Sequence, residues 1–231
     1  MNGKENLDYT ILMPCLNEEN SLEYCICLAK EGIASLGLRA EILIADNGST
    51  DASVDVARRC GARVVHVEKK GYGAALMGGI KAARGRYVIM GDADGSYDFS
   101  SIGGFVQALE AGNALVMGNR FAGGIEPHAM PLSHKVGVRV LSWLARLRFH
   151  TGVYDFHCGL RAFEREAALK LGLRCPGMEF ASEMIAKFAR SGASIAQTPV
   201  VLHRDRRGRR PHLRTVRDGL RHLRLILRGV V

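Results

Sequence analysis

The stretch YTILMP at residues 9–14 is a short apolar run that ends in proline, and EILIA at residues 41–45 is a second run of the same kind. Short continuous apolar runs are typical of strands that are buried on both faces of a parallel sheet. Each run is followed by polar residues suited to a turn, and then by apolar residues at helical spacing over 22–36 and 52–60. The order strand, loop, helix therefore occurs twice, and it decides the fold class.

The same order continues beyond residue 60. Residues 63–67 and 86–90 are predicted strands, and a glycine-rich turn with a helix lies between them over 71–83. Strands that alternate with helices at this spacing predict an α/β protein with a mostly parallel, Rossmann-like sheet flanked by helices.

The pattern is less regular after Ser101. The further elements that we expect are helices over 102–111, 136–149, 164–171 and 180–191, strands over 114–117 and 194–202, and a loop over 121–131. The chain shows no internal repeat and no linker composition. Residues 1–203 are therefore predicted to form one domain, followed by a basic loop and an amphipathic helix over 204–231.

Polar residues directly follow three of the first four predicted strands. They are Pro14, Asn17 and Glu18, then the run Asp46 to Asp51 (DNGSTD), then Asp92, Ala93 and Asp94. The carboxyl ends of parallel strands meet at one edge of the sheet, where ligands bind in this class of fold. Two aspartates at one strand end suit a divalent cation, which binds oxygen ligands and often substrate phosphates as well. The sequence therefore predicts a site for a metal-bound diphosphate.

Each of these segments also has a simpler interpretation. Residues 46–51 are rich in the residue types that favour turns and helix caps, and an acidic turn such as 92–94 is common after a strand. The stretch 71–73 (GYG) is similar to the start of a dinucleotide fingerprint, but Leu76 occupies the place of the third glycine. The order of the segments at successive strand ends favours the diphosphate site over a dehydrogenase or a non-catalytic anion-binding module.

Composition and cysteine spacing exclude several other classes. The 231 residues are 47% apolar and 24% charged, as in an ordinary globular protein. The six cysteines include no C-x-x-C pair, so a structural zinc site is not predicted. The first ten residues lack the apolar core of a signal peptide, and no run of about 18 apolar residues occurs. We therefore expect a cytoplasmic protein with reduced thiols.

The positive charge is concentrated at the C-terminus, because residues 203–231 carry a formal charge of +8 and the preceding residues only +1. From Pro211 onward, apolar residues at helical spacing alternate with arginines displaced by one position. The apolar set is Leu213, Val216, Leu220, Leu223 and Leu227, and the basic set is Arg214, Arg217, Arg221, Arg224 and Arg228. Such a helix fits either an anionic membrane surface or a docking site on the domain. Nucleic acid is not expected, because the tail has no aromatic residue on which bases stack.

Seven segments form a combination that is specific although no single one is. The first four are Pro14-x-x-Asn17-Glu18, Asp46-Asn47-Gly48-Ser49-Thr50-Asp51, Gly71-Tyr72-Gly73-Ala74-Ala75 and Asp92-Ala93-Asp94. The last three are Gly118-Asn119-Arg120, Asp155-x-x-Cys158-Gly159-Leu160-Arg161 and Glu179-Phe180-x-x-Glu183-Met184. The first four resemble family 2 glycosyltransferases with the GT-A fold. The last three are similar to polyprenyl-phosphate sugar synthases of the dolichyl-phosphate mannose synthase type.

The resemblance implies a role for each matching residue. The residues implied to bind the nucleotide sugar are Pro14, Asn17, Glu18, Asp46, Asn47, Ser49, Asp51, Gly71, Gly73, Asp92, Ala93, Asp94, Arg204 and Arg207. Among them, Asp46 would contact the base or the ribose. Asp94 would bind Mg²⁺ or Mn²⁺ directly, while Asp92 would contact the sugar or support the metal site. Arg204 and Arg207 belong to the basic segment that closes over the phosphates in this family.

The remaining implied roles concern the acceptor. Arg120 would bind the phosphate of a polyprenyl phosphate. Because a phosphate monoester is already anionic at neutral pH, it needs no general base, and a single displacement would invert the anomeric carbon. An acceptor hydroxyl would need a base, for which Asp155 and Glu183 are the candidates. In the alternative interpretation, Asp155 only pairs with Arg161 and Glu183 only holds its helix.

The chain departs from the family pattern at three places. Asn47 stands where close relatives often have a second acidic residue, and Ser96 stands where they have a glutamine. After Gly208 the sequence reads RRPH over 209–212, instead of Ser or Thr followed by Lys. We expect a UDP- or GDP-linked hexose or N-acetylhexosamine as donor. Two acceptors stay open: a polyprenyl phosphate at an anionic membrane, or a soluble small molecule as in tunicamycin-type antibiotic assembly.

Overall fold

The structure is a computed structural model that describes residues 7–208 and 215–229. Its strands are β1 (Tyr9–Cys15), β2 (Ala40–Asp46), β3 (Arg63–His66), β4 (Tyr87–Met90), β5 (Leu115–Asn119), β6 (Gly124–Ile125), β7 (Arg161–Glu164) and β8 (Ile195–Leu202). Its helices are α1 (Leu22–Ser35), α2 (Ser53–Arg59), α3 (Tyr72–Ala82), α4 (Gly103–Glu110), α5 (Arg120–Gly123), α6 (Leu132–Phe149), α7 (Arg165–Lys170), α8 (Phe180–Arg190) and α9 (Thr215–Arg228), with a 3₁₀ turn η1 (Phe99–Ser101). The predicted alternation of strands and helices is confirmed through β4.

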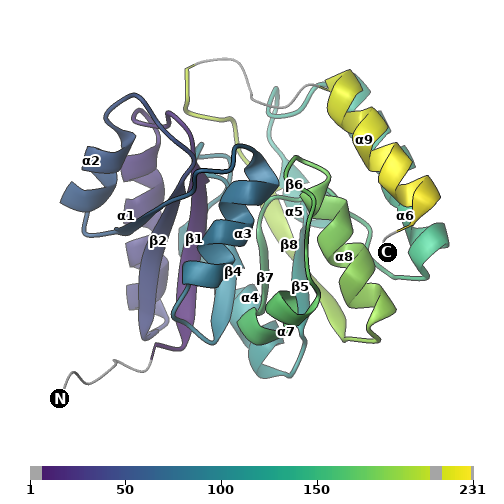
Figure 1. The fold of residues 1–231 in the computed structure, drawn as a ribbon, viewed down its shortest axis with the longest axis horizontal. Coiled ribbons are helices and arrows are strands. Elements are labelled where there is room, and N and C mark those ends of the chain that lie inside the picture. Colours follow the sequence, from purple (N-terminus) through teal and green to yellow (C-terminus); the bar gives the residue numbers. More distant parts are fainter. Residues whose placement is uncertain (1–6, 209–214, 230–231) are drawn as a thin grey trace.

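The strands form one eight-stranded sheet in the order β3-β2-β1-β4-β7-β5-β8-β6 (Figure 1). Every neighbouring pair is parallel except the two pairs that β7 makes, with β4 on one side and β5 on the other. The predicted, mostly parallel α/β sheet is therefore confirmed.

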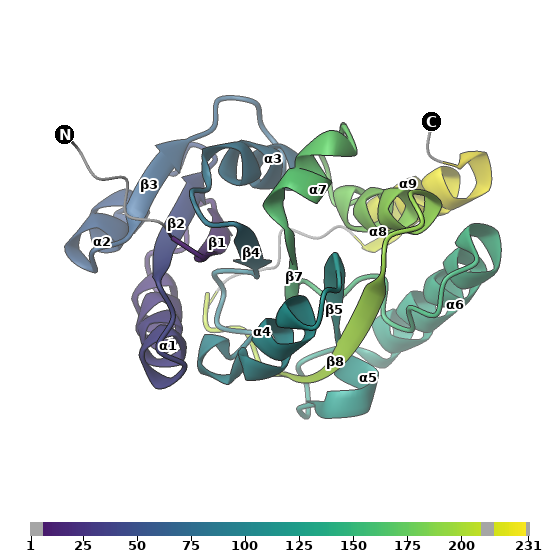
Figure 2. The ribbon, with the colours of Figure 1, turned by 90° about the horizontal axis from the view of Figure 1, so that it is seen from below.

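Helices cover both faces of the sheet, with α1 and α4 on one side and α3 and α7 on the other (Figure 2). Successive residues of a strand point to opposite faces. In β1, Ile11 and Met13 belong to the core shared with α1 and α4, whereas Leu12 belongs to the core shared with α3 and α8. The apolar run of β1 is continuous because both of its faces are buried.

Four elements were not predicted, namely η1, α5, β6 and β7. The strand β7 lies in the middle of the sheet and begins with Arg161, which is only 1% exposed although it is charged. Its guanidinium donates to the carbonyl oxygens of Cys158 and Ala181, so its charge is held by backbone oxygens. Because a charged residue interrupts the apolar run, the sequence does not show this segment as a buried strand. The elements α5 and β6 occupy 120–125, where a loop over 121–131 was expected, and like η1 they are too short to show a period.

The C-terminal helix α9 packs against α6 and α8 at one end of the molecule (Figures 1 and 2). It docks through Asp218, His222 and Ile226, which are buried, and leaves Leu220 and Leu227 exposed. The leucine stripe, for which docking and membrane contact were the two alternatives, is therefore turned partly outward. Residues 209–214, which include the expected Leu213 and Arg214, lie outside the described residues. Within the described ranges, no helix has the length and hydropathy needed to cross a bilayer.

Candidate active site

The predicted strand ends meet at one edge of the sheet. Cys15, at the end of β1, lies opposite Asp46 at the end of β2, and the N–H of Gly91 after β4 donates to the carbonyl of Leu12. The loop after β1 is tied to both neighbours. The Ser21 hydroxyl donates to the carbonyl of Ala93 (2.7 Å), and the N–H of Glu18 donates to Ser53 Oγ (2.7 Å). The three polar segments therefore form one rim.

The rim segment after β2 is a hydrogen-bonded turn as well as part of the site. The Asp46 carboxylate accepts from the N–H groups of Gly48 and Ser49 and lies 3.1 Å from His66 Nδ1. Burial by itself would raise the pKa of Asp46, but hydrogen bonds from Ser49 and His66 outweigh it and hold the pKa below its ordinary value. Asp46 is therefore ionised at neutral pH.

The loops after β1 and β2 are joined by side chains that the family resemblance implies in binding of the nucleotide sugar. Ser49 Oγ accepts from the N–H of Asn17 (2.9 Å), and Asn17 Oδ1 accepts from the N–H of Thr50 (2.7 Å). Asp51 accepts from the N–H and hydroxyl of Ser53, the first residue of α2, while the N-cap position itself is Ala52. The turn interpretation of this segment and its place at the rim are both correct.

The Asn47 side chain makes three hydrogen bonds to the loop that follows β3. Its Nδ2 donates to the carbonyls of Val67 and Lys69, both at 2.9 Å, and its Oδ1 accepts from the N–H of Gly71 at 2.8 Å. A carboxylate cannot donate to two carbonyls. Asn47 therefore fixes the 67–71 loop against β2 instead of contributing charge.

Asp92 is half-buried in the rim and is oriented by Tyr72, for which the sequence predicted no role. The Tyr72 hydroxyl donates to Asp92 Oδ1 (2.9 Å), and Gly159 leaves room for Oδ2, because a Cβ at this position would overlap it. Burial raises the pKa of Asp92 to about 6, and the negative charge of Asp94 acts in the same direction. The sequence signal that could have pointed to Tyr72 is its position between Gly71 and Gly73.

Asp94 forms an ion pair with the guanidinium of Arg207. Its Oδ1 accepts from the N–H and hydroxyl of Ser96, while its Oδ2 lies 2.5 Å from Arg207 Nη2. Arg207 Nη1 also lies 3.5 Å from Glu18 Oε1, and the N–H of Arg206 donates to the carbonyl of Asp94. The basic segment 203–208 therefore crosses the rim and places a guanidinium between two carboxylates.

These residues fit a divalent cation that is bound together with a diphosphate. A positive group already lies at Asp94 Oδ2, and the oxygen donors suit a hard cation. Among residues 7–208 and 215–229, no group of three or more His, Cys, Asp or Glu side chains is placed to hold a metal. The remaining ligands would then be water and phosphate oxygens, as is common for magnesium.

Arg204 lies apart from Arg207, although both were expected at the phosphates. Its Nε donates to the carbonyl of Pro127 (2.7 Å), its backbone N–H donates to Glu126, and its side chain is exposed. The structure thus brings Arg207 to the rim and holds Arg204 at the loop before α6. Arg206, which sequence analysis did not single out, lies over the ring of Tyr24, 3.8 Å from the ring centroid.

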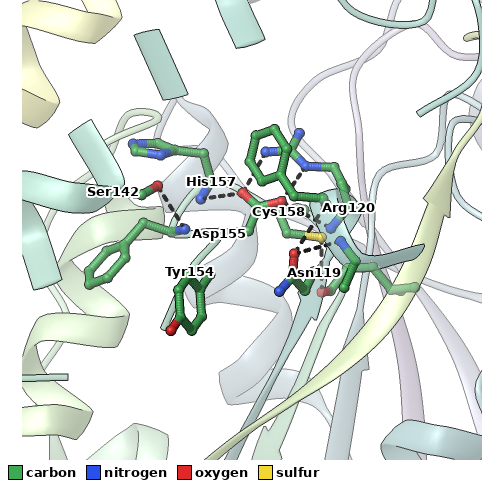
Figure 3. A network of polar contacts seen from close by, with 12 residues as sticks. Asn119, Arg120, Ser142, Tyr154, Asp155, His157 and Cys158 are labelled. Atoms are coloured by element: carbon green, nitrogen blue, oxygen red, sulfur yellow. Dashed lines mark hydrogen bonds and ion pairs between the residues drawn. The ribbon is translucent and has the colours of Figure 1, made fainter. Parts of the chain in front are cut away.

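Arg120 and Asp155 form a buried ion pair beyond the rim (Figure 3). Their side chains are 6% and 0% exposed, and Arg120 Nε and Nη2 each lie 2.7 Å from a different oxygen of Asp155. The backbone N–H of Arg120 donates to the same carboxylate. The alternative in which Asp155 pairs with Arg161 is wrong, because Arg161 donates to backbone carbonyls instead.

Glu183 holds a loop that contacts the glycine-rich turn. Its carboxylate accepts from the N–H groups of Arg174 and Cys175 at 2.8–3.0 Å and lies 3.2 Å from Lys187 Nζ. The loop 175–177 in turn packs on Gly71 and Gly73, where any Cβ would overlap a carbonyl oxygen of the loop. The two glycines therefore permit this close approach.

The parallel sheet and the acidic rim at its carboxyl edge define an α/β glycosyltransferase of the GT-A fold. The family model described as "Glycosyl transferase family 2" matches residues 10–172. The chain belongs to this family, as its motifs predicted.

Curated relatives are also glycosyltransferases. The low-salt glycan biosynthesis hexosyltransferase Agl6 of Haloferax volcanii is 36% identical over 220 residues, which are 94% of this chain and 52% of the relative. The chain thus spans about half the length of that relative. An uncharacterised glycosyltransferase of Mycobacterium bovis is 34% identical, with 83% of each chain covered. A dolichyl-phosphate hexose transferase of Haloferax volcanii is 29% identical, with 87% of this chain and 85% of the relative covered.

A solved structure with the same fold is that of glucosyl-3-phosphoglycerate synthase from Mycobacterium tuberculosis. The complex of this synthase with Mn²⁺, UDP-glucose and phosphoglyceric acid has a TM-score of 0.68 and 26% identity, and the match covers 96% of this chain and 77% of the synthase. The comparison confirms the GT-A prediction.

Proposed function

We propose that the chain transfers a hexose from a nucleoside diphosphate sugar, with Mg²⁺ or Mn²⁺, to a polyprenyl phosphate at a membrane surface. The observation that carries the donor half is the Arg207 guanidinium between Asp94 and Glu18, at the edge where the first, second and fourth strands end. Structures of the related synthase hold UDP with Mn²⁺ or Mg²⁺, which supports this donor and these cations.

In this proposal the chain's own residues bind and orient the donor. The rim around Asp46 and Asn17 receives the nucleoside, and Asp94 Oδ2 faces the diphosphate. A bound cation supplies neutralisation of the leaving nucleoside diphosphate. Arg207 then adds positive charge beside the phosphates, because its backbone is held at the rim by the bond between Arg206 N–H and the Asp94 carbonyl.

The acceptor half rests on the likeness to the dolichyl-phosphate hexose transferase and on the buried Arg120–Asp155 pair. A phosphate acceptor attacks without a general base, and attack from behind the anomeric carbon inverts it. In the structure, the Asp155 and Glu183 carboxylates are both saturated with internal donors. This arrangement supports an acceptor that arrives already ionised.

The test is transfer of labelled hexose with three donors, UDP-glucose, UDP-N-acetylglucosamine and GDP-mannose, to a polyprenyl phosphate in vesicles. Asp94→Ala should abolish transfer with any of them. Asp98→Ala is a matched control, because Asp98 accepts from Ser100 in the same way that Asp94 accepts from Ser96, but it starts η1. Full transfer by Asp94→Ala would refute the donor half, and no lipid product with any donor would refute the acceptor half.

A second candidate is a soluble acceptor that carries a phosphate. It is favoured by the likeness to glucosyl-3-phosphoglycerate synthase, whose structure holds phosphoglyceric acid. The same assay with 3-phosphoglycerate in place of the lipid separates the two candidates, since only one of the two acceptors should give a labelled product.

A further inference from the structure

The helix α6 carries two apolar stripes, of which only one is buried in the protein. Val138, Ala145 and Phe149 face the core. On the opposite side lie large apolar residues that are 50–77% exposed, namely Leu132, Val136, Val140, Trp143 and Leu147. At 100° per residue these five positions fall within about 80° of arc. They therefore form one continuous strip, and a strip of this size on a soluble protein marks an interaction surface.

Basic residues border this strip, and acidic ones are absent from its sequence. Residues 127–153 contain no Asp and no Glu, whereas Lys135, Arg139 and Arg146 follow one edge of the strip. The guanidinium groups of Arg139 and Arg146 lie over the rings of Phe121 and Tyr154. The α6 strip is therefore an apolar surface with a cationic margin.

The neighbouring helix α9 extends the same kind of surface. Leu220 and Leu227 are 61% and 68% exposed, while the one acidic residue of the helix, Asp218, is buried. The arginines of α9 are all exposed on the part of the helix whose side chains are described, and they are Arg217, Arg221, Arg224 and Arg228. The two helices lie side by side at one end of the molecule (Figure 2).

We propose that the exposed face of α6, together with the outward face of α9, binds the surface of an anionic lipid bilayer. Apolar side chains with a tryptophan enter the boundary between headgroups and acyl chains, and the arginines meet anionic headgroups. A second copy of the chain fits less well, because it would bring the exposed arginine rows of two α9 helices together.

The position of α6 gives this surface a consequence for the active site. Just before α6, Glu126 and Pro127 accept hydrogen bonds from Arg204, next to the basic segment that reaches Asp94. Soon after α6, Asp155 pairs with Arg120. The segment 126–155 thus contacts Arg204 near its start and Arg120 at its end, and α6 forms its middle. In the proposal, a bilayer against α6 lies next to this segment. This last step rests on the proposed polyprenyl-phosphate acceptor, whereas bilayer binding itself does not.

The experiment uses Trp143, because it is the only tryptophan of the chain and is 56% exposed. Phosphatidylcholine vesicles with 30% phosphatidylglycerol should shift its emission to the blue and carry the protein upward in a density gradient. Pure phosphatidylcholine vesicles should do so weakly, and high salt should reduce the effect. Absence of both the shift and flotation at low salt would overturn the proposal.

Variants identify the surface. Leu147→Ser with Val140→Ser should lower vesicle affinity about tenfold or more, and Arg217→Gln with Arg224→Gln about 25-fold, at about 1 kcal/mol for each arginine. The controls are Leu36→Ser, an exposed leucine at the end of α1, and Arg58→Gln with Arg59→Gln on α2. Equal losses in the controls would overturn the assignment to α6 and α9.

Two further readouts keep the outcomes distinct. Sedimentation without lipid should show a monomer, and a dimer that Leu147→Ser dissociates would assign the surface to a second copy instead. Binding of UDP with Mn²⁺, followed by thermal shift, should be unchanged in the Leu147→Ser variant. Normal UDP binding together with lost flotation supports the bilayer surface even if the protein uses no lipid acceptor. Failure of the bilayer proposal can therefore be told apart from failure of the proposed function.

Discussion

Removing one partner of the buried Arg120–Asp155 pair should cost far more stability than removing one partner of a surface ion pair. In Asp155→Asn the Arg120 guanidinium stays buried, at 6% side-chain exposure, without its counter-charge. Breaking a buried pair on one side costs about 3–5 kcal/mol. Since a domain of this kind has a total stability of about 5–15 kcal/mol, the variant should remain folded but lose much of its margin.

The assay is urea unfolding followed by far-UV circular dichroism at neutral pH, with three variants compared. Arg120→Met together with Asp155→Leu should recover most of the loss, because a buried pair replaced on both sides by apolar groups is often near neutral. Asp8→Asn is the matched control, since Asp8 pairs with Arg39 in the same two-pronged way but at the surface, with side chains 42% and 63% exposed. Its loss should be much smaller. If Asp155→Asn and Asp8→Asn lose the same stability, the reasoning about burial is refuted.

Three further predictions concern other buried groups. Asn47→Asp should destabilise the protein by about 3 kcal/mol in urea unfolding, because the new carboxylate would face the carbonyls of Val67 and Lys69; an unchanged midpoint would contradict this. Burial lowers the pKa of His222 to about 4, below an unfolded value near 6.5, so stability should be constant above about pH 6.5 and fall by about 3 kcal/mol as the pH drops toward 4. His222→Gln should flatten that fall, and an equally steep fall in the variant would assign it to other groups. Arg207→Gln should tighten Mn²⁺ binding without donor about tenfold by calorimetry, since Asp94 Oδ2 is then free; weaker binding would show that Arg207 does not compete with the cation.

The sequence predicted those parts of the molecule that depend on local periodicity. The apolar runs of β1, β2 and β4 and the polar segments after them were placed correctly, because buried parallel strands and caps have local signatures. The strand β7 was missed because it begins with the buried Arg161, whose charge interrupts the apolar pattern and is satisfied by the carbonyls of Cys158 and Ala181, one local and one twenty residues away. Tyr72 and Arg206 were missed for the same kind of reason, since their partners Asp92 and Tyr24 are distant in sequence.

The basic segment 203–208 links the donor rim to the helix that we assign to the bilayer. Its backbone is fixed at the rim by bonds from His203 N–H to the Ser96 carbonyl and from Arg206 N–H to the Asp94 carbonyl. Only the side chain of Arg207 occupies the position at Asp94 Oδ2. A cation that takes this oxygen therefore needs to displace one side chain, not the segment. In the proposed function, the displaced guanidinium would remain beside the diphosphate. The group that pairs with Asp94 and Glu18 without donor would then also neutralise phosphate charge when the donor is bound.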